Sequence, residues 1–351
     1  MTFQIDDLRQ LIDARGPSGD EHSVAAVFRT LIESHVDDVS TDDFGNLVAT
    51  SEGARNAPEI LLAAHTDELA FLIDEITDDG FLRFSWLGAH YPGNFAGQRV
   101  EVGPERVPGV IGPKSRHRMD DEEARSLPED WYIDLGADSE EAVEQLDVRV
   151  GDYATWDRGL VSLAGGRFSG RAIDDRLGLA ILAAVARTTD TDATVHYAAV
   201  AQEEPGLRGA ETTGYQVDPD IALAVDVFPG NHPGDDDRFE VPLGGGPAVE
   251  LAEGVGQMLN GVLVNRQVRE WIRRAGSEAD VEPTNCVFRN GFTDARALQT
   301  IRGGRHAGTV SVPCRYTHSP VETFQKSDAV ETVSLLSAAL TTPFPSREES
   351  R

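Results

Sequence analysis

The chain has 351 residues, long enough to bury a sizeable core in one large domain or in two. Its formal charge of −29 excludes nucleic-acid binding as the default reading, because phosphate contacts need clustered cations. Only two of the 31 basic residues are lysines, and acidic runs such as Asp235–Asp237 occur. This composition indicates a halophilic protein kept in solution in concentrated salt, where charge repulsion is screened within about 3 Å at 1 M.

The first 65 residues predict two helices followed by strands. The N-terminus has no basic region and no apolar core of the kind found in signal peptides. Apolar positions recur at helical spacing over 3–15 and 21–36, on either side of the turn Gly16–Gly19. Strands are predicted at 39–41, 46–50 and 59–65. The last of these is continuously apolar, which indicates a strand buried on both faces.

From about residue 71 to 165 the pattern changes to short alternating strands separated by Gly and Pro. These strands are predicted at 71–76, 81–87, 99–102, 107–111 and 152–156, with one helix at 139–146. Such a segment predicts a small β-rich domain inserted into a larger one. We therefore expect a discontinuous catalytic domain formed by 1–68 and 166–345, an inserted domain at 69–165, and a tail at 346–351.

After residue 174 the alternation of strand and helix returns. Helices are predicted at 174–187, 261–275, 294–302 and 326–340, and strands at 194–202, 221–227, 281–287 and 308–312. The predicted fold class is α/β, with a helix-flanked mixed sheet and an inserted PDZ-like or barrel domain. No apolar run approaches the 18 residues of a membrane span. The two cysteines, Cys286 and Cys314, favour a reducing, cytoplasmic location over a disulfide framework.

Several predicted strands end in side chains that can bind metal. Sites in open α/β sheets form beyond the carboxyl ends of the strands, so these groups can converge from distant positions. Asp174 follows the small residues Ser169-Gly170 and begins an apolar helix. The candidate ligands are His65, Asp174, Glu203, Glu204, Asp226 and His318. Four carboxylates and two imidazoles match a pair of divalent cations that share one carboxylate, and this donor set suits zinc, cobalt or manganese better than calcium or magnesium.

Two further roles follow from the spacing of these residues. Asp67 lies two residues after His65, so on an extended segment both side chains project to the same side and the carboxylate can orient the imidazole. Glu203 and Glu204 are adjacent and point apart, so one can bind metal while the other acts as a general base. The spacing alone does not decide which does which.

Each residue also has a structural interpretation. A histidine such as His65 at a strand end is more often hydrogen-bonded than a ligand. Glu203-Glu204 can be a solvated loop edge, and Asp174 a helix N-cap. A purely structural role explains Asp226 less well. A carboxylate inside the apolar strand Ala224-Val-Asp-Val costs free energy unless it is paired or bound to metal.

Five ordered motifs carry a resemblance to a known family. They are His65-Thr-Asp-Glu-Leu-Ala-Phe, Ala172-Ile-Asp-Asp-Arg-Leu-Gly, Gln202-Glu-Glu-Pro-Gly-Leu-Arg-Gly-Ala, Ala224-Val-Asp-Val and Pro313-Cys-Arg-Tyr-Thr-His-Ser-Pro-Val-Glu. Together they resemble the tetrahedral (TET) aminopeptidases of the glutamyl/deblocking aminopeptidase family, which are two-zinc metallopeptidases. The match runs in order from Gly16 to Glu322 and includes segments of the inserted domain.

The resemblance implies roles for the candidate residues. Asp174 would bridge two metals, most simply zinc, with cobalt or manganese as alternatives. His65 and Asp226 would complete one site, and Glu204 and His318 the other. Glu203 would be the base, and Asp67 would orient His65. The substrates would be peptides with a free N-terminus. The inserted domain would mediate dimers that assemble into a twelve-subunit tetrahedron, with no membrane or nucleic-acid partner.

This sequence departs from the family pattern at a few places, including Thr66, Asp175, Pro205 and Arg305-His306. None of these removes a proposed ligand. Related two-metal deacylases or dipeptidases would keep every ligand, and a metal-bound assembly subunit without activity is a third reading. A metal-independent glycosidase would leave His65 and His318 unexplained. The segments 244–246, 291–294 and 303–308 are expected to shape the substrate pocket, but they do not reveal the preferred N-terminal residue.

Overall fold

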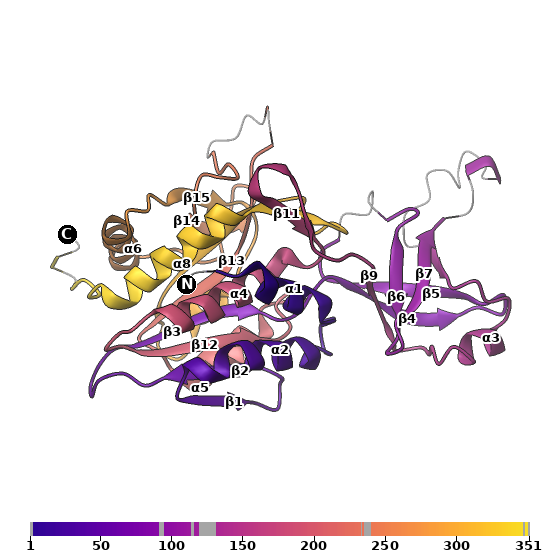
Figure 1. The fold of residues 1–351 in the computed structure, drawn as a ribbon, viewed down its shortest axis with the longest axis horizontal. Helices are drawn as coiled ribbons and strands as arrows, with labels where there is room; N and C mark the ends of the chain where they lie inside the picture. The colour runs from indigo at the N-terminus through magenta and orange to yellow at the C-terminus, as the bar shows by residue number, and fades with distance from the viewer. Residues whose placement is uncertain are drawn as a thin grey trace.

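The computed structural model describes residues 3–90, 95–113, 116–118, 131–232, 234, 240–346 and 348–349. Two bodies are distinguished in Figure 1: a large sheet flanked by helices, and a smaller β-structure set to one side of it. The large sheet has twelve strands, and the smaller structure is a closed barrel of six. The predicted fold class is therefore confirmed.

The centre of the large sheet consists of parallel strands in the order β12, β3, β13, β17. They span Thr194–Val200, Glu59–His65, Ile221–Pro229 and His306–Arg315. Along β3, Ile60 and Leu62 pack into the core on one face, whereas Leu61 and Ala63 pack into the core on the other. Continuous apolarity thus arises because successive side chains enter two different cores.

Antiparallel strands extend this parallel centre on both sides. On one side lie β1 (Asp38–Thr41) and β2 (Leu47–Ser51), and on the other lie β18 (Glu322–Gln325), β11 (Arg167–Gly170) and β10 (Val161–Ser162). A branch from β17 consists of β14 (Ala248–Val255), β15 (Thr284–Phe288) and β16 (Asn290–Gly291). The sheet is mixed, as the sequence predicts.

Helices cover both faces of the sheet. One face carries α1 (Ile5–Asp13), α2 (His22–Ile32), α4 (Ile173–Thr188), α6 (Arg266–Ala279) and α8 (Lys326–Thr341). The other carries α5 (Arg208–Val217) and α7 (Ala295–Thr300). Short 3-10 turns occur at Glu33–His35 and Ala164–Gly166. The apolar helix α4 is buried between the sheet and the N-terminal helices, so its first residues are fixed against the strand ends.

The barrel contains every described strand between residues 70 and 156. Its strands are β4 (Ala70–Ile76), β5 (Phe81–Leu87), β6 (Arg99–Val102), β7 (Val107–Gly112), β8 (Tyr132–Asp134) and β9 (Tyr153–Trp156), with α3 at Glu140–Glu144 and a 3-10 turn at Arg116–Arg118. Its core is aromatic, and Phe71 meets both Phe95 and Trp156 edge to face. The barrel therefore has its own core, separate from that of the large sheet.

The structure corrects part of the predicted element list. The helix predicted at 261–275 was wrong at its start, because α6 begins only at Arg266, where the Asn265 side chain accepts a hydrogen bond from Val268 N. Strand β14 was missed because two buried glutamates, Glu250 and Glu253, interrupt its apolar pattern. Helix α5 was also missed. Both cysteines are buried and unpaired.

Within the described ranges, no helix is both long and apolar enough to cross a bilayer. The predicted tail at 346–351 lies partly outside the described residues.

Candidate functional site

The predicted ligands come from separate elements and meet at one edge of the large sheet. His65 is the last residue of β3, and Asp226 lies near the end of β13. Glu204 follows β12, and Asp174 stands at the beginning of α4, where its backbone is not yet helical. His318 lies between β17 and β18. The parallel strands bring the first three together because their carboxyl ends share one edge.

Asp174 lies between the two imidazoles. Its Oδ1 is 3.0 Å from His65 Nε2, and its Oδ2 is 3.4 Å from His318 Nε2. The same His318 nitrogen is 4.0 Å from Glu204 Oε1. Each oxygen of Asp174 thus faces a different histidine, which is the arrangement expected of a carboxylate shared between two cations.

Within the part of the chain that the structure describes, two groups of donor atoms are compact enough to hold an ion, and His318 belongs to neither. Donor atoms of His65, Asp174 and Glu204 lie within 4.8 Å of one another, and so do those of His65, Asp175 and Asp226. Asp175 was not among the predicted ligands. Its two oxygens accept hydrogen bonds from His65 N (3.2 Å) and Gly178 N (3.0 Å), so it also holds the backbone of β3 against α4.

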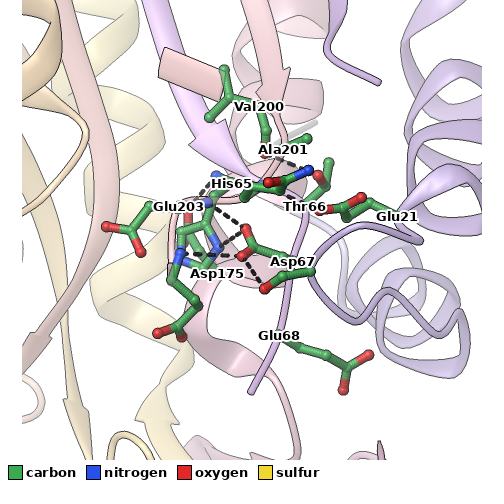
Figure 2. Close-up of polar contacts among 12 residues, drawn as sticks. Glu21, His65, Thr66, Asp67, Glu68, Asp175, Val200, Ala201 and Glu203 are labelled. Carbon is green, nitrogen blue, oxygen red and sulfur yellow. Dashed lines mark hydrogen bonds and ion pairs between the residues drawn. The ribbon is translucent and has the colours of Figure 1, made fainter. Parts of the chain in front are cut away.

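Asp67 is buried beside the histidine that it was predicted to orient. Its Oδ1 is 3.3 Å from His65 Nδ1 (Figure 2). It also accepts hydrogen bonds from Glu203 N (2.9 Å), Glu204 N (3.1 Å) and Ser18 Oγ (2.8 Å). One carboxylate therefore fixes both the imidazole at the end of β3 and the backbone that carries the two glutamates.

Glu203 lines the pocket in front of these residues. Among the described residues, none donates a hydrogen bond to its carboxylate, so both oxygens are available to a ligand in the pocket. Burial raises the pKa of Glu203 well above its ordinary value, and the Asp294 and Glu204 carboxylates add to this effect against the opposing influence of His65. A carboxylate with a raised pKa can accept and return a proton near neutral pH.

The pKa shifts in the cluster indicate that its buried carboxylates lack enough positive charge around them. Burial raises the pKa of Glu204 to about 7 and that of Asp226 to about 7, and in both cases the Asp174 carboxylate contributes. Burial likewise raises the pKa of Asp294 to about 8. Burial opposes charge on His318, but Glu204 and Asp174 outweigh it and raise its pKa to about 11. Buried carboxylates that lack sufficient counter-charge, together with imidazole donors, fit divalent cations.

A second buried charge network lies beneath the site. Glu68 is 2% exposed and pairs with both Arg171 and Arg176, which are 1% and 0% exposed. Gly16 N also donates to Glu68, at 2.9 Å. The Arg176 guanidinium further donates to the Thr66 carbonyl (2.5 Å). This network ties the segment after β3 to the segment before α4.

Sequence reasoning gave no role to Glu322, which connects two predicted ligands. Its Oε2 accepts from Asp174 N (2.8 Å), and its Oε1 accepts from His318 N (2.9 Å). The side chain is buried on β18. Glu322 was the last residue of the fifth motif, but its partners are backbone amides, and a sequence pattern does not display such contacts.

The site opens into a pocket of about 960 Å³. Apart from the ligand cluster, its charged lining residues are Glu211 and Arg296, and the guanidinium of Arg296 stacks 3.9 Å from the ring centroid of Phe292. The predicted segment 291–294 contributes Gly291, Phe292 and Thr293 to the wall. Neither 244–246 nor 303–308 supplies a lining residue among those described.

Known proteins match this chain over most of its length. A family model described as M42 glutamyl aminopeptidase matches residues 45–335. The lysyl aminopeptidase of Pyrococcus furiosus is 28% identical over 344 residues, covering 95% of each chain. An aminopeptidase from Desulfurococcus kamchatkensis superposes with a TM-score of 0.90 at 34% identity, covering 96% of this chain and 94% of its own. The TET1 peptidase of Pyrococcus horikoshii has a TM-score of 0.84 at 30% identity, covering 96% and 99%.

Proposed function

The chain belongs to the M42 glutamyl aminopeptidase family and is a metal-dependent aminopeptidase. From this premise we propose a role for each residue of the site. Asp174 would be the ligand shared by two divalent cations. His65 and Asp226 complete one site, Glu204 and His318 complete the other, and Glu203 is the general base. Zinc is the proposed metal, with cobalt or manganese as alternatives, because the donors are imidazoles and carboxylates.

The observation that carries this proposal is the position of Asp174 between His65 and His318, with one oxygen toward each. A helix N-cap would direct its carboxylate toward the amides of its own helix instead. A glycosidase that acts through two carboxylates does not require two imidazoles beside a third carboxylate. The arrangement therefore favours a shared ligand over both alternatives.

When bound, the cations polarise the scissile carbonyl and lower the pKa of water. Glu203 accepts the proton of the attacking water on its free carboxylate and then donates it to the leaving amine, a transfer typically worth about 10²–10⁴-fold in rate. Asp67 keeps the backbone of Glu203 in place through its 2.9 Å hydrogen bond. It also holds His65 in the orientation that presents Nε2 to Asp174.

The proposed substrates are peptides with a free N-terminus. The pocket is about 960 Å³, large enough for an N-terminal side chain together with part of the following chain. Its described wall carries both Glu211 and Arg296, so these two side chains do not single out one sign of charge for the substrate. A related two-metal deacylase would use the same ligands, and only the substrate distinguishes the two activities.

We propose further that the protein self-associates, with the barrel in the dimer contact. The Pyrococcus horikoshii relative is described as assembling into a tetrahedron or a large octahedral shell. The match with the present chain covers 99% of that relative's chain. A cytoplasmic location is proposed from the two unpaired cysteines. A requirement for concentrated salt is proposed from the formal charge of −29.

The test is metal analysis of the purified protein combined with hydrolysis of a panel of chromogenic aminoacyl anilides and N-acyl amino acids in 2–3 M KCl. We expect two equivalents of divalent metal per subunit and hydrolysis of the aminoacyl anilides only. Hydrolysis confined to the N-acyl amino acids would instead identify a deacylase. Activity that persists without metal after exhaustive chelation would overturn the proposal.

A further inference from the structure

The segment Gly88–His90 follows strand β5 of the barrel and reaches the edge of the large sheet where the candidate ligands lie. Ala89 and His90 line the same pocket as His318. We propose that this segment is a positioning element for the metal site formed by Glu204 and His318, so that one of the two sites depends on the barrel. The inference rests on the two-metal function proposed above.

The direct contact is a hydrogen bond to the imidazole. His318 Nδ1 lies 2.7 Å from the Ala89 carbonyl oxygen, which can only accept, so Nδ1 carries the proton. With the proton on Nδ1, the lone pair that a cation would need is the one on Nε2. Nε2 is the nitrogen that faces Asp174 and Glu204, at 3.4 and 4.0 Å. The Ala89 carbonyl therefore fixes the tautomer and the ring orientation that a metal ligand requires.

The neighbouring glycine packs against the other ligand of the same site. Gly88 has a φ of +84°, in the region that favours glycine. A Cβ at this position would overlap the Leu69 side chain and lie 2.9 Å from Glu204 Oε2. The segment thus leaves no room for a side chain between Gly88 and Glu204, and it contacts His318 through Ala89.

His90 anchors the segment in the barrel. Its Nε2 donates to the Ala70 carbonyl at 2.9 Å, and its ring stacks on Phe71 with 4.6 Å between centroids. Phe95 and Trp156 contact the same ring edge to face. Burial lowers the pKa of His90 to about 4, so the ring is neutral and its single N–H is held by Ala70. The position of the Ala89 carbonyl is therefore set by the barrel core.

The two proposed metal sites differ in this respect. His65 and Asp226 both lie on central strands of the large sheet, and their described contacts come from that body. His318 and Glu204 lie on loops, and each contacts the barrel segment. Disturbing the segment should therefore weaken one site and leave the other intact.

The experiment compares the wild-type protein with Gly88→Ala and a matched control, Gly136→Ala. Gly136 is a barrel glycine with a similar φ of +78°, and an added Cβ there would meet nothing within 4 Å. Zinc stoichiometry and stepwise affinity are measured at fixed salt by titration against a chelating indicator. We expect two equivalents for the wild type and the control. In Gly88→Ala, one equivalent should bind about 10–100-fold more weakly and the other should be unchanged.

Equal affinities for both equivalents in all three proteins would overturn the inference, as would weakening of both equivalents in Gly88→Ala. A wild type that binds no metal would instead remove the proposed function itself. If Gly88→Ala does not fold, His90→Phe replaces it, because phenylalanine keeps the stacked ring and removes the hydrogen bond to Ala70. That variant should show the same selective weakening, and two unchanged equivalents would count against the proposal.

Discussion

Two buried clusters of charge lie close together in this molecule and are balanced in different ways. Around Glu68, the positive charge belongs to the chain itself, since Arg171 and Arg176 both contact the carboxylate. Burial alone would raise the pKa of Glu68, but the two guanidiniums outweigh it and lower the pKa below its ordinary value. Around Asp174, the carboxylates outnumber the imidazoles, and the pKa of Glu204 rises to about 7.

The difference separates a structural network from a functional one. A buried ion pair that is complete within the chain needs no ligand and holds its segments in place. A buried group of carboxylates with too few cations stays costly until cations arrive from solution. Four substitutions test this distinction, and the expected effects decrease from the first to the last.

Asp174→Asn should have the largest effect, because the proposed bridging carboxylate serves both cations. We expect metal content to fall at both sites together and activity to fall to background. Metal analysis after dialysis at a fixed free zinc concentration measures the first effect. Loss of one equivalent with full retention of the other would show that Asp174 belongs to a single site.

Glu203→Gln should remove turnover while leaving the cations bound. The amide cannot accept the proton of the attacking water, so kcat should fall about 10²–10⁴-fold. Metal content and the melting temperature should stay at wild-type values. Near-normal kcat in this variant would assign the base to another residue.

Glu68→Gln tests the balanced cluster, where the effect should be on stability. Removing the carboxylate leaves Arg171 and Arg176 buried without their counter-charge, which costs about 3–5 kcal/mol. The free energy of unfolding is measured by denaturant titration at constant KCl. Where the folded protein is retained, it should still bind two metals, and selective loss of metal at unchanged stability would contradict the assignment.

Glu322→Gln should have the smallest effect. Glutamine offers one carbonyl oxygen in place of two, so it can accept from Asp174 N or from His318 N but not from both. We expect metal affinity to fall about 10-fold, with a modest loss of kcat. Titration with zinc measures the difference, with Glu331→Gln, a half-buried glutamate on the following helix α8, as the control.

The sequence predicted the central strands and the candidate ligands at their ends because both depend on local pattern. The continuous apolar run before His65 indicated a strand buried on two faces, and the structure places such a strand there. The two glutamates of β14 concealed a strand, because the hydroxyls that donate hydrogen bonds to them, those of Ser311 and Thr293, lie far along the chain. The amides held by Glu322 and the carbonyl of Ala89 were equally hidden, since backbone groups occur at every position.

The way in which the barrel is inserted has a consequence for folding. Its first and last strands pair directly, with Phe71 opposite Ala154 and Leu72 opposite Tyr153. A barrel that forms early would therefore bring the end of β3 close to the start of β11 and close a loop of roughly 90 residues. The chain entropy of closing that loop would be lost before β3 pairs with β12 and β13, which are distant in sequence. The insertion would then lower the effective contact order of the large sheet, because an early-folding barrel holds the end of β3 near the start of β11.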